Sequence, residues 1–146
     1  MGDRVSVSIT IGGSLPANLV DDFVTLVQAE RLSIDWGGEP FDRSQFPEDG
    51  PLRLFGQEIR DGEIAEIEDF CCTHDLPYLR WSGGAPSFGP EIVVWKGSGD
   101  RLRFAADEEE HVVIDADEAS ELGTFEAIAE HFADGSYQPP AFRIAV

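Results

Sequence analysis

The alternation of apolar and polar residues near the start of the chain constrains the fold most strongly. Residues 5–11 read Val-Ser-Val-Ser-Ile-Thr-Ile, so four apolar residues are separated by three hydroxyl residues. A period of two places the apolar side chains on one face of a β-strand and the hydroxyls on the other. We therefore expect a strand with one buried face, ended by Gly12 and Gly13.

Two cycles of helix and strand are predicted after this first strand. The first cycle has a helix capped by Ser14 and a strand over residues 32–36. The second cycle has a strand over residues 52–59, a helix capped by Asp61 and a strand over residues 79–81. Apolar residues at helical spacing mark the inner face of both helices.

The rest of the chain predicts three more elements and a hairpin. Residues 91–105 resemble a hairpin, and residues 111–115 and 142–146 resemble single strands. A helix over residues 124–134 lies between these two strands. We expect this helix to bury four apolar side chains: Phe125, Ile128, Ala129 and Phe132.

Two stretches share a spacing of tryptophan, glycine and proline that suggests an internal repeat. Trp36 and Trp81 are each followed, directly or after one residue, by Gly-Gly-x-Pro. This favours two strand–helix–strand units over residues 4–50 and 51–100, followed by an acidic part over residues 104–146. Alternatively, Gly-Gly-x-Pro only ends strands that happen to contain tryptophan.

These elements predict an α+β fold in one domain that spans residues 1–146. The sheet is expected to be mostly antiparallel, with about three helices on one face, close to a ferredoxin-like duplication. No apolar run approaches the roughly 20 residues that a membrane helix requires, and the N-terminus lacks the apolar stretch of a signal peptide. We therefore expect a cytoplasmic protein.

Negative charge is concentrated in the last third of the chain. The sequence has 29 acidic and 10 basic residues, with a formal net charge of −19. Residues 104–146 hold 11 of the acidic residues and one basic residue, Arg143. Such a charge repels nucleic acid and anionic membranes and attracts basic surfaces. Salt adaptation or solubility would explain acidity in general, but not its uneven distribution.

The candidate partner-binding residues are the carboxylates of this acidic part. Three of them, Glu126, Glu130 and Asp134, are spaced four residues apart, so on a helix they form a row with about 6 Å between neighbours. The full set is Asp107, Glu108, Glu109, Glu110, Asp115, Asp117, Glu118, Glu121, Glu126, Glu130 and Asp134.

The sequence contains no clear catalytic, metal or cofactor motif. Cys71 and His74 could share a helix face, but Cys71 falls on the apolar face and no second pair completes a zinc site. Acids from Asp115 to Glu126 partly follow a calcium-loop spacing, yet Ser120 occupies the position that requires glycine. The Gly-rich segment 83–89 lacks the lysine of a phosphate loop. An enzyme is therefore not the favoured class, and no cofactor or metal is expected.

Charge and size favour a protein–protein interaction domain with a basic partner. One hypothesis is an inhibitor that mimics nucleic acid and blocks a DNA- or RNA-binding complex, by analogy with acidic antirestriction and anti-CRISPR proteins. A second hypothesis is an immunity or antidote protein against a basic toxin. A third is a small enzyme or ligand-binding module that uses the loops after Trp36 and Trp81.

Overall fold

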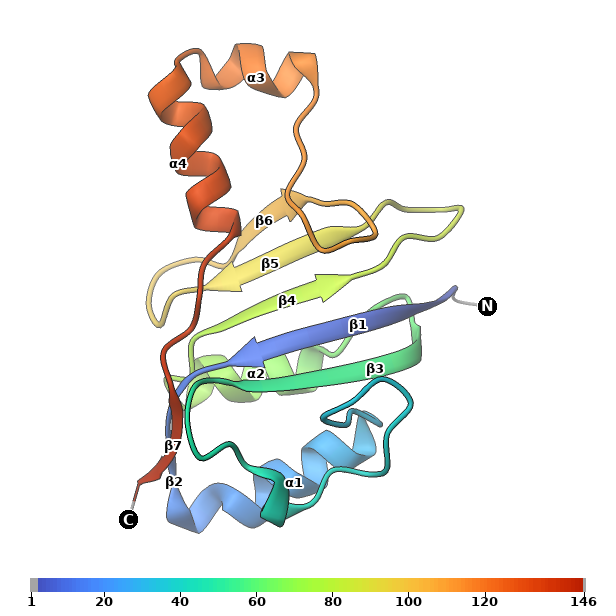
Figure 1. Cartoon of the computed structure of the whole chain (residues 1–146), viewed down its shortest axis with the longest axis vertical. Helices are drawn as coiled ribbons and strands as arrows, with labels where there is room; N and C mark the ends of the chain where they lie inside the picture. The colour runs from blue at the N-terminus through green and yellow to red at the C-terminus, as the bar shows by residue number, and fades with distance from the viewer. Residues whose placement is uncertain (1–2, 146) are drawn as a thin grey trace.

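Five antiparallel strands form the main sheet, in the order β3-β1-β4-β5-β6 (Figure 1). The computed structural model describes residues 3–145. The strands of the main sheet are β1 (Arg4–Ile11), β3 (Leu52–Arg60), β4 (Tyr78–Ser82), β5 (Glu91–Trp95) and β6 (Leu102–Ala105). A separate parallel pair joins β2 (Gly13–Pro16) to β7 (Phe142–Ala145), so the C-terminal strand lies beside the segment that follows β1.

Four α-helices accompany the sheets. They are α1 (Val20–Ala29), α2 (Ala65–Thr73), α3 (Ala116–Leu122) and α4 (Phe125–Gly135), and two short 3₁₀ turns cover Ala17–Leu19 and Arg43–Gln45. Within residues 3–145, none of these helices has the length and apolar character needed to cross a membrane. The α+β class and the antiparallel sheet predicted from the sequence are confirmed.

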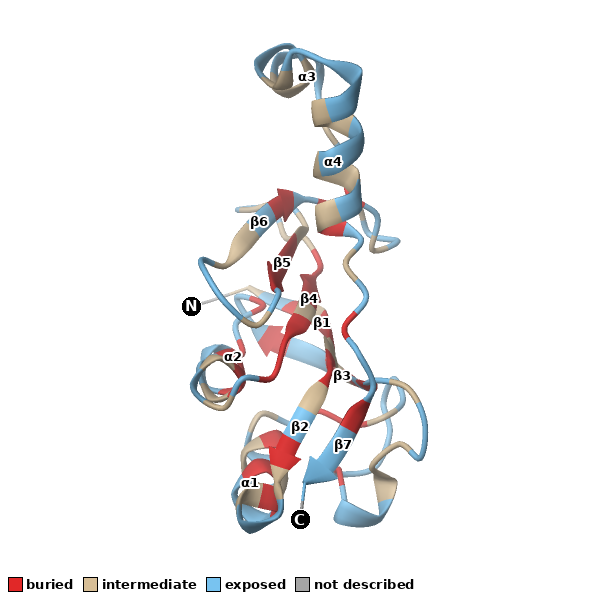
Figure 2. Ribbon diagram, turned by 90° about the vertical axis from the view of Figure 1, so that its left-hand side faces the viewer, coloured by how far each residue is buried: buried red, intermediate tan, exposed pale blue. Residues whose placement is uncertain are grey.

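The main sheet has a hydrophobic core on each face. Val93 and Trp95 belong to one core, whereas Ile92 and Val94 belong to the other, because neighbouring residues of a strand point to opposite faces. Helices α1 and α2 cover the first face, and α4 packs against part of the second (Figure 2). The expected arrangement of about three helices on one face is therefore not confirmed.

The ferredoxin-like duplication is not confirmed either. Strands β1 and β3 are joined through α1, yet they are antiparallel neighbours in which Ile9 pairs with Leu54. A strand–helix–strand unit of the ferredoxin-like type has parallel strands. The two stretches with similar spacing also differ, because Trp81 lies within β4 whereas Trp36 lies outside every strand.

The strand predicted over residues 32–36 is wrong. Only Ser33 pairs with the sheet, through an isolated bridge to Phe55. The Asp35 carbonyl accepts hydrogen bonds from the Ser33 hydroxyl at 3.2 Å and from the Gly38 N–H at 3.0 Å. These bonds turn the chain away from the sheet edge and leave Trp36 43% exposed.

The strand predicted over residues 111–115 is also wrong. Val112 forms only an isolated bridge with Ala106, and the Asp115 carboxylate accepts the Glu118 N–H at 2.8 Å as the cap of α3. Helix α3 was not predicted at all. Its residues are mostly acidic or small, so they present no apolar pattern that would reveal a helix.

Both predicted helix caps are wrong, and the cap of α4 was not predicted. Ser14 lies in β2, and α1 begins only at Val20. Asp61 lies in a turn with φ 55°, so it does not cap α2. Thr124 does cap α4, since its hydroxyl oxygen accepts the Ala127 N–H at 3.1 Å.

Candidate functional site

Helices α3 and α4 form a helical arm, residues 115–135, that projects beyond β6 (Figures 1 and 2). Gly123 lies between the helices with φ 82°, a conformation that glycine adopts without strain. Side-chain caps begin both helices, so each has a defined first turn. The arm therefore has a fixed shape although its outer part does not touch the sheet.

The C-terminal half of α4 anchors the arm. Phe132 packs against the second core, and the His131 ring lies 4.9 Å from the Phe104 ring. Gly135 is buried so closely that an added Cβ would lie 2.4 Å from Cγ2 of Val112. Phe125, at the other end of α4, is 80% exposed and Ala129 is also exposed, so the predicted burial of these two residues is wrong. The first part of α4 therefore extends beyond the sheet and is not covered by it.

The outer part of the arm carries carboxylates without partners. Asp117, Glu121, Glu126 and Glu130 are exposed, and no lysine or arginine within residues 3–145 forms an ion pair with them. Glu118, in contrast, lies 3.8 Å from Nε2 of His131. These carboxylates are free to contact another molecule, and they lie on the same two helices as the exposed Phe125.

Other candidate carboxylates have intramolecular roles. Both oxygens of Glu110 lie 3.0 Å from Nη2 of Arg53, and one of them accepts the Ser8 hydroxyl at 2.5 Å. Asp134 lies 2.6 Å from Nζ of Lys96, and Asp115 caps α3. These groups hold the protein together, so their charge is already partly compensated.

The acidic turn that contains Asp107 is stabilised by its own backbone. Oδ1 of Asp107 accepts the N–H groups of His111 and Glu109, each at 2.9 Å. The His111 N–H contributes most to lowering the pKa of Asp107, with the Glu109 N–H acting in the same direction. Glu109 is exposed, whereas Glu108 accepts the Gly84 N–H at 2.7 Å. This hydrogen bond attaches the turn to the loop after β4.

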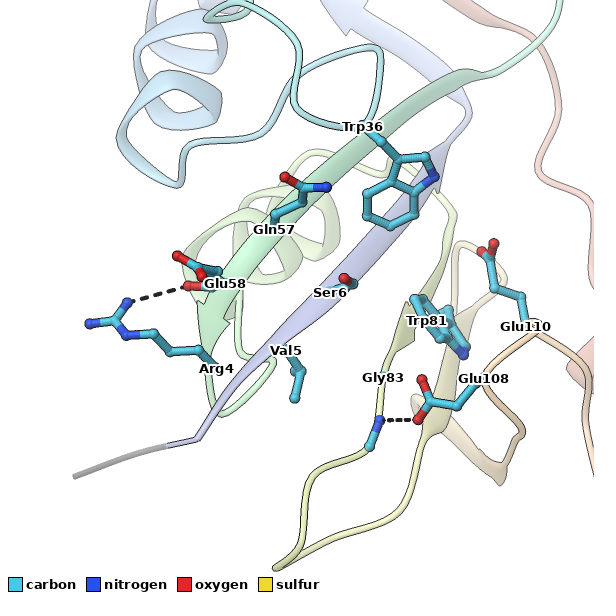
Figure 3. Close-up of a pocket in the computed structure, with 11 residues that line it drawn as sticks. Arg4, Val5, Ser6, Trp36, Gln57, Glu58, Trp81, Gly83, Glu108 and Glu110 are labelled. Atoms are coloured by element: carbon cyan, nitrogen blue, oxygen red, sulfur yellow. Dashed lines mark hydrogen bonds between the residues drawn. The ribbon is translucent and has the colours of Figure 1, made fainter.

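A cleft of about 960 Å³, here called the tryptophan groove, lies between this acidic turn and β3 (Figure 3). A β-bulge shapes it, because Gln57 and Glu58 of β3 stand opposite the single residue Ser6 of β1. The groove is lined by Arg4, Val5, Ser6, Trp36, Gln57, Glu58, Trp81, Gly83, Gly84, Glu108 and Glu110.

Sequence reasoning identified only part of this groove. The similar surroundings of Trp36 and Trp81 pointed to the two tryptophans, and both line the same cleft. Arg4, Gln57 and Glu58 were missed. The hydroxyl face of the first strand was an available signal, since a polar face on a central strand has to meet water, a ligand or another polar side chain, as Ser8 meets Glu110.

The other residues considered for catalysis or metal binding do not form a site. Cys71 is fully buried, and burial raises the pKa of its thiol. The His74 ring packs 4.4 Å from the Phe70 ring. Within the described part of the chain, no group of three or more His, Cys, Asp or Glu residues is arranged to hold a metal ion.

No protein-family model, curated protein or solved structure matches the chain. The features of the molecule that point to a function are the geometry and charge of the helical arm and of the tryptophan groove.

Proposed function

We propose that this protein is an acidic interaction domain that binds a basic protein through the helical arm. In this proposal it acts in the cytoplasm and inhibits a DNA- or RNA-binding complex by occupying the surface that binds nucleic acid. One observation supports it above all: exposed carboxylates without ion-pair partners lie beside an exposed Phe125 on an anchored arm.

The chemistry of the arm suits a nucleic-acid-binding surface. Glu126 and Glu130 are one helical turn apart, which separates their charges by about 6 Å. A groove for nucleic acid presents basic side chains to a regular array of phosphates, and an array of carboxylates attracts the same side chains. Association would release counterions from both surfaces into solution, as it does when the partner binds nucleic acid, so the affinity should fall as the salt concentration rises.

Phe125 provides an apolar contact within this charged surface. Its side chain is 80% exposed, and aromatic residues are enriched in protein interfaces. Charge alone gives fast but weakly selective association, whereas a buried aromatic side chain adds affinity for a matching pocket. The capped helices and the close packing of Gly135 fix the direction of this contact before binding.

Affinity capture from the native host, with matched charge variants, tests the proposal. The wild-type protein should retain a basic nucleic-acid-binding protein at low salt and release it as the salt concentration rises. The double variant Glu126→Lys, Glu130→Lys should lose this partner. The control Glu48→Lys, Asp49→Lys changes the net charge equally at two exposed positions far from the arm in sequence, and it should keep the partner.

A competition assay with the purified partner then examines the mechanism. Wild-type protein should displace labelled nucleic acid from the partner, and the arm variant should not. Equal losses in the arm and control variants would show that only the total charge matters, which would contradict the proposal. If the captured protein is a toxin that the domain neutralises without displacing nucleic acid, the immunity hypothesis replaces it.

A further inference from the structure

We propose that the tryptophan groove is a second binding site, which receives a basic peptide segment with an arginine side chain stacked on Trp36. This site is separate from the helical arm. It accounts for the exposure of Trp36, which the arm does not use. The inference is based on the shape, the aromatic surface and the charge of the groove.

The groove exists because one part of the sheet is uncovered. Helices α1 and α2 cover the first face, and α4 reaches only β5 and β6 on the second. The second face of β1 and β3 is therefore open near the β-bulge, where Ser6 and Gln57 line the groove, whereas Ser8 further along β1 is covered by Glu110 (Figure 3). A volume of about 960 Å³ is at the upper end of the range for ligand sites and exceeds one arginine side chain, so it also accommodates flanking peptide residues.

Both tryptophans are held in position before any ligand binds. The Trp36 ring packs 4.6 Å from the Phe55 ring, and the Arg53 guanidinium lies 4.9 Å from the centre of that same Phe55 ring. The Trp81 indole N–H donates to the Asp107 carbonyl at 2.9 Å. Trp36 still has 43% of its surface exposed, whereas Trp81 is only 4% exposed and forms part of the wall, so a ligand can stack on Trp36 with little loss of side-chain freedom.

The charge of the groove selects a cation. Four lining residues are charged: Arg4, Glu58, Glu108 and Glu110. Arg53 compensates Glu110, but no cation within residues 3–145 forms an ion pair with Glu58 or Glu108. The Arg4 guanidinium donates to the Glu58 carbonyl at 3.3 Å, which leaves the Glu58 carboxylate unpaired. An anion would be repelled here.

A guanidinium group matches both features of the groove. It is planar and weakly hydrated, so it stacks on an indole ring, and its edge donates hydrogen bonds to a carboxylate. One oxygen of Glu108 already accepts the Gly84 N–H, which fixes the carboxylate and leaves the other oxygen for a ligand. An arginine-containing segment of a protein is therefore the occupant with complementary charge and shape.

Titration with a short peptide tests this inference directly. The probe is acetylated and amidated Gly-Arg-Gly-Arg-Gly, and its control replaces both arginines by citrulline, which is similar in shape but neutral. Arginine peptide should change the tryptophan fluorescence and bind with at least about tenfold higher affinity than the citrulline peptide. Calorimetry measures both affinities on the intact protein.

Matched variants separate the groove from the general acidity. Glu108→Gln keeps an oxygen for the Gly84 N–H and should weaken the arginine peptide about tenfold. Glu48→Gln removes the same charge at an exposed position outside both proposed sites and should leave this affinity unchanged. Trp36→Ala, at a half-exposed position, should weaken the peptide about fivefold while the circular dichroism spectrum stays that of the folded protein.

Three results would overturn the inference. These are equal binding of the citrulline peptide, equal weakening by Glu48→Gln and Glu108→Gln, and no binding at millimolar peptide. None of these results bears on the proposed role of the helical arm, because the capture assay with the Glu126 and Glu130 variants does not depend on the groove.

Discussion

Nε of Arg80 lies 3.4 Å from Oε2 of Glu68, and both side chains are almost completely buried between α2 and the sheet. The contact is an ion pair without the geometry of a hydrogen bond. The other end of the guanidinium lies 3.2 Å from Glu91 and donates to the Ser82 hydroxyl. Arg80 therefore links α2, β4 and β5 through its ion pairs with Glu68 and Glu91.

Removing Arg80 should destabilise the protein strongly. Arg80→Met leaves the Glu68 carboxylate buried without a counter-charge, which should lower the free energy of unfolding by about 3–5 kcal/mol. Glu68→Gln should cost less, since Arg80 keeps its contact with Glu91. Urea denaturation of each variant measures the two values.

An exposed ion pair provides the control for this prediction. Arg43 lies 3.1 Å from Asp21, but both side chains are mostly exposed, so Arg43→Met should change the free energy of unfolding by no more than about 0.5 kcal/mol. Similar losses in Arg80→Met and Arg43→Met would show that burial of the Arg80 pair has no energetic consequence.

Cys71 should be protected from alkylation in the folded protein. Its side chain is fully buried on α2, and burial raises the pKa of the thiol, so reactive thiolate is scarce. Iodoacetamide at about pH 8 should modify the half-buried Cys72 and leave Cys71 intact until denaturant is added. Mass spectrometry of the Cys72→Ser variant isolates the signal of Cys71. Rapid labelling of that variant without denaturant would contradict the burial.

Elements whose pattern is local were predictable from the sequence. The alternation over residues 5–11 identified β1, and the hairpin of β5 and β6 followed from two apolar segments separated by a glycine-rich turn. The helix predicted over residues 124–134 matches α4, which Thr124 caps because its hydroxyl needs only the N–H three residues later. These patterns depend only on residues that are close in the sequence, so the sequence alone reveals them.

Features that depend on distant contacts were not predictable. The alternation around Trp36 resembled a strand, but the Asp35 turn and the single bridge at Ser33 determine its structure. Helix α3 could have been suspected from Asp115 as its cap and from Gly123 after its end, despite its lack of an apolar face. The tryptophan groove required the acidic turn to reach β1 and β4, a contact that no local pattern reveals.

The Asp107 carboxylate should stabilise the protein at neutral pH and lose this effect in acid. Backbone N–H groups lower its pKa in the folded state, so its contribution is fully present above the unfolded value of about 4 and is lost as the pH falls through the folded value. Asp107→Asn should therefore lower the melting temperature at neutral pH and lower it much less at about pH 2.

The neighbouring Glu109 provides the matched control for this pH dependence. It is exposed, and no hydrogen bond of its side chain is recorded in the described part of the chain. Glu109→Gln should leave the melting temperature close to that of the wild type at both pH values. A constant difference between wild type and Asp107→Asn across the pH range would contradict the role of the Asp107 charge.

Gly135 should be essential for the attachment of the helical arm. An added Cβ would lie 2.4 Å from Val112 and 3.2 Å from Phe104, too close for either side chain to remain in place. Gly135→Ala should therefore push α4 away from the second core and lower the free energy of unfolding by about 1–3 kcal/mol. Hydrogen exchange should become faster in α4 while the amides of β1 and β4 keep their protection.

Gly89→Ala separates this steric effect from a general effect of replacing glycine. No atom lies within 4 Å of a Cβ added at Gly89, so this variant should match the wild type in stability or slightly exceed it. If Gly135→Ala is as stable as Gly89→Ala and its α4 amides exchange at the wild-type rate, the close packing of Gly135 does not hold the arm. The fixed direction of Phe125 and the arm carboxylates would then need another cause. If the arm does loosen, weaker binding of the basic partner should accompany it, although every carboxylate is still present.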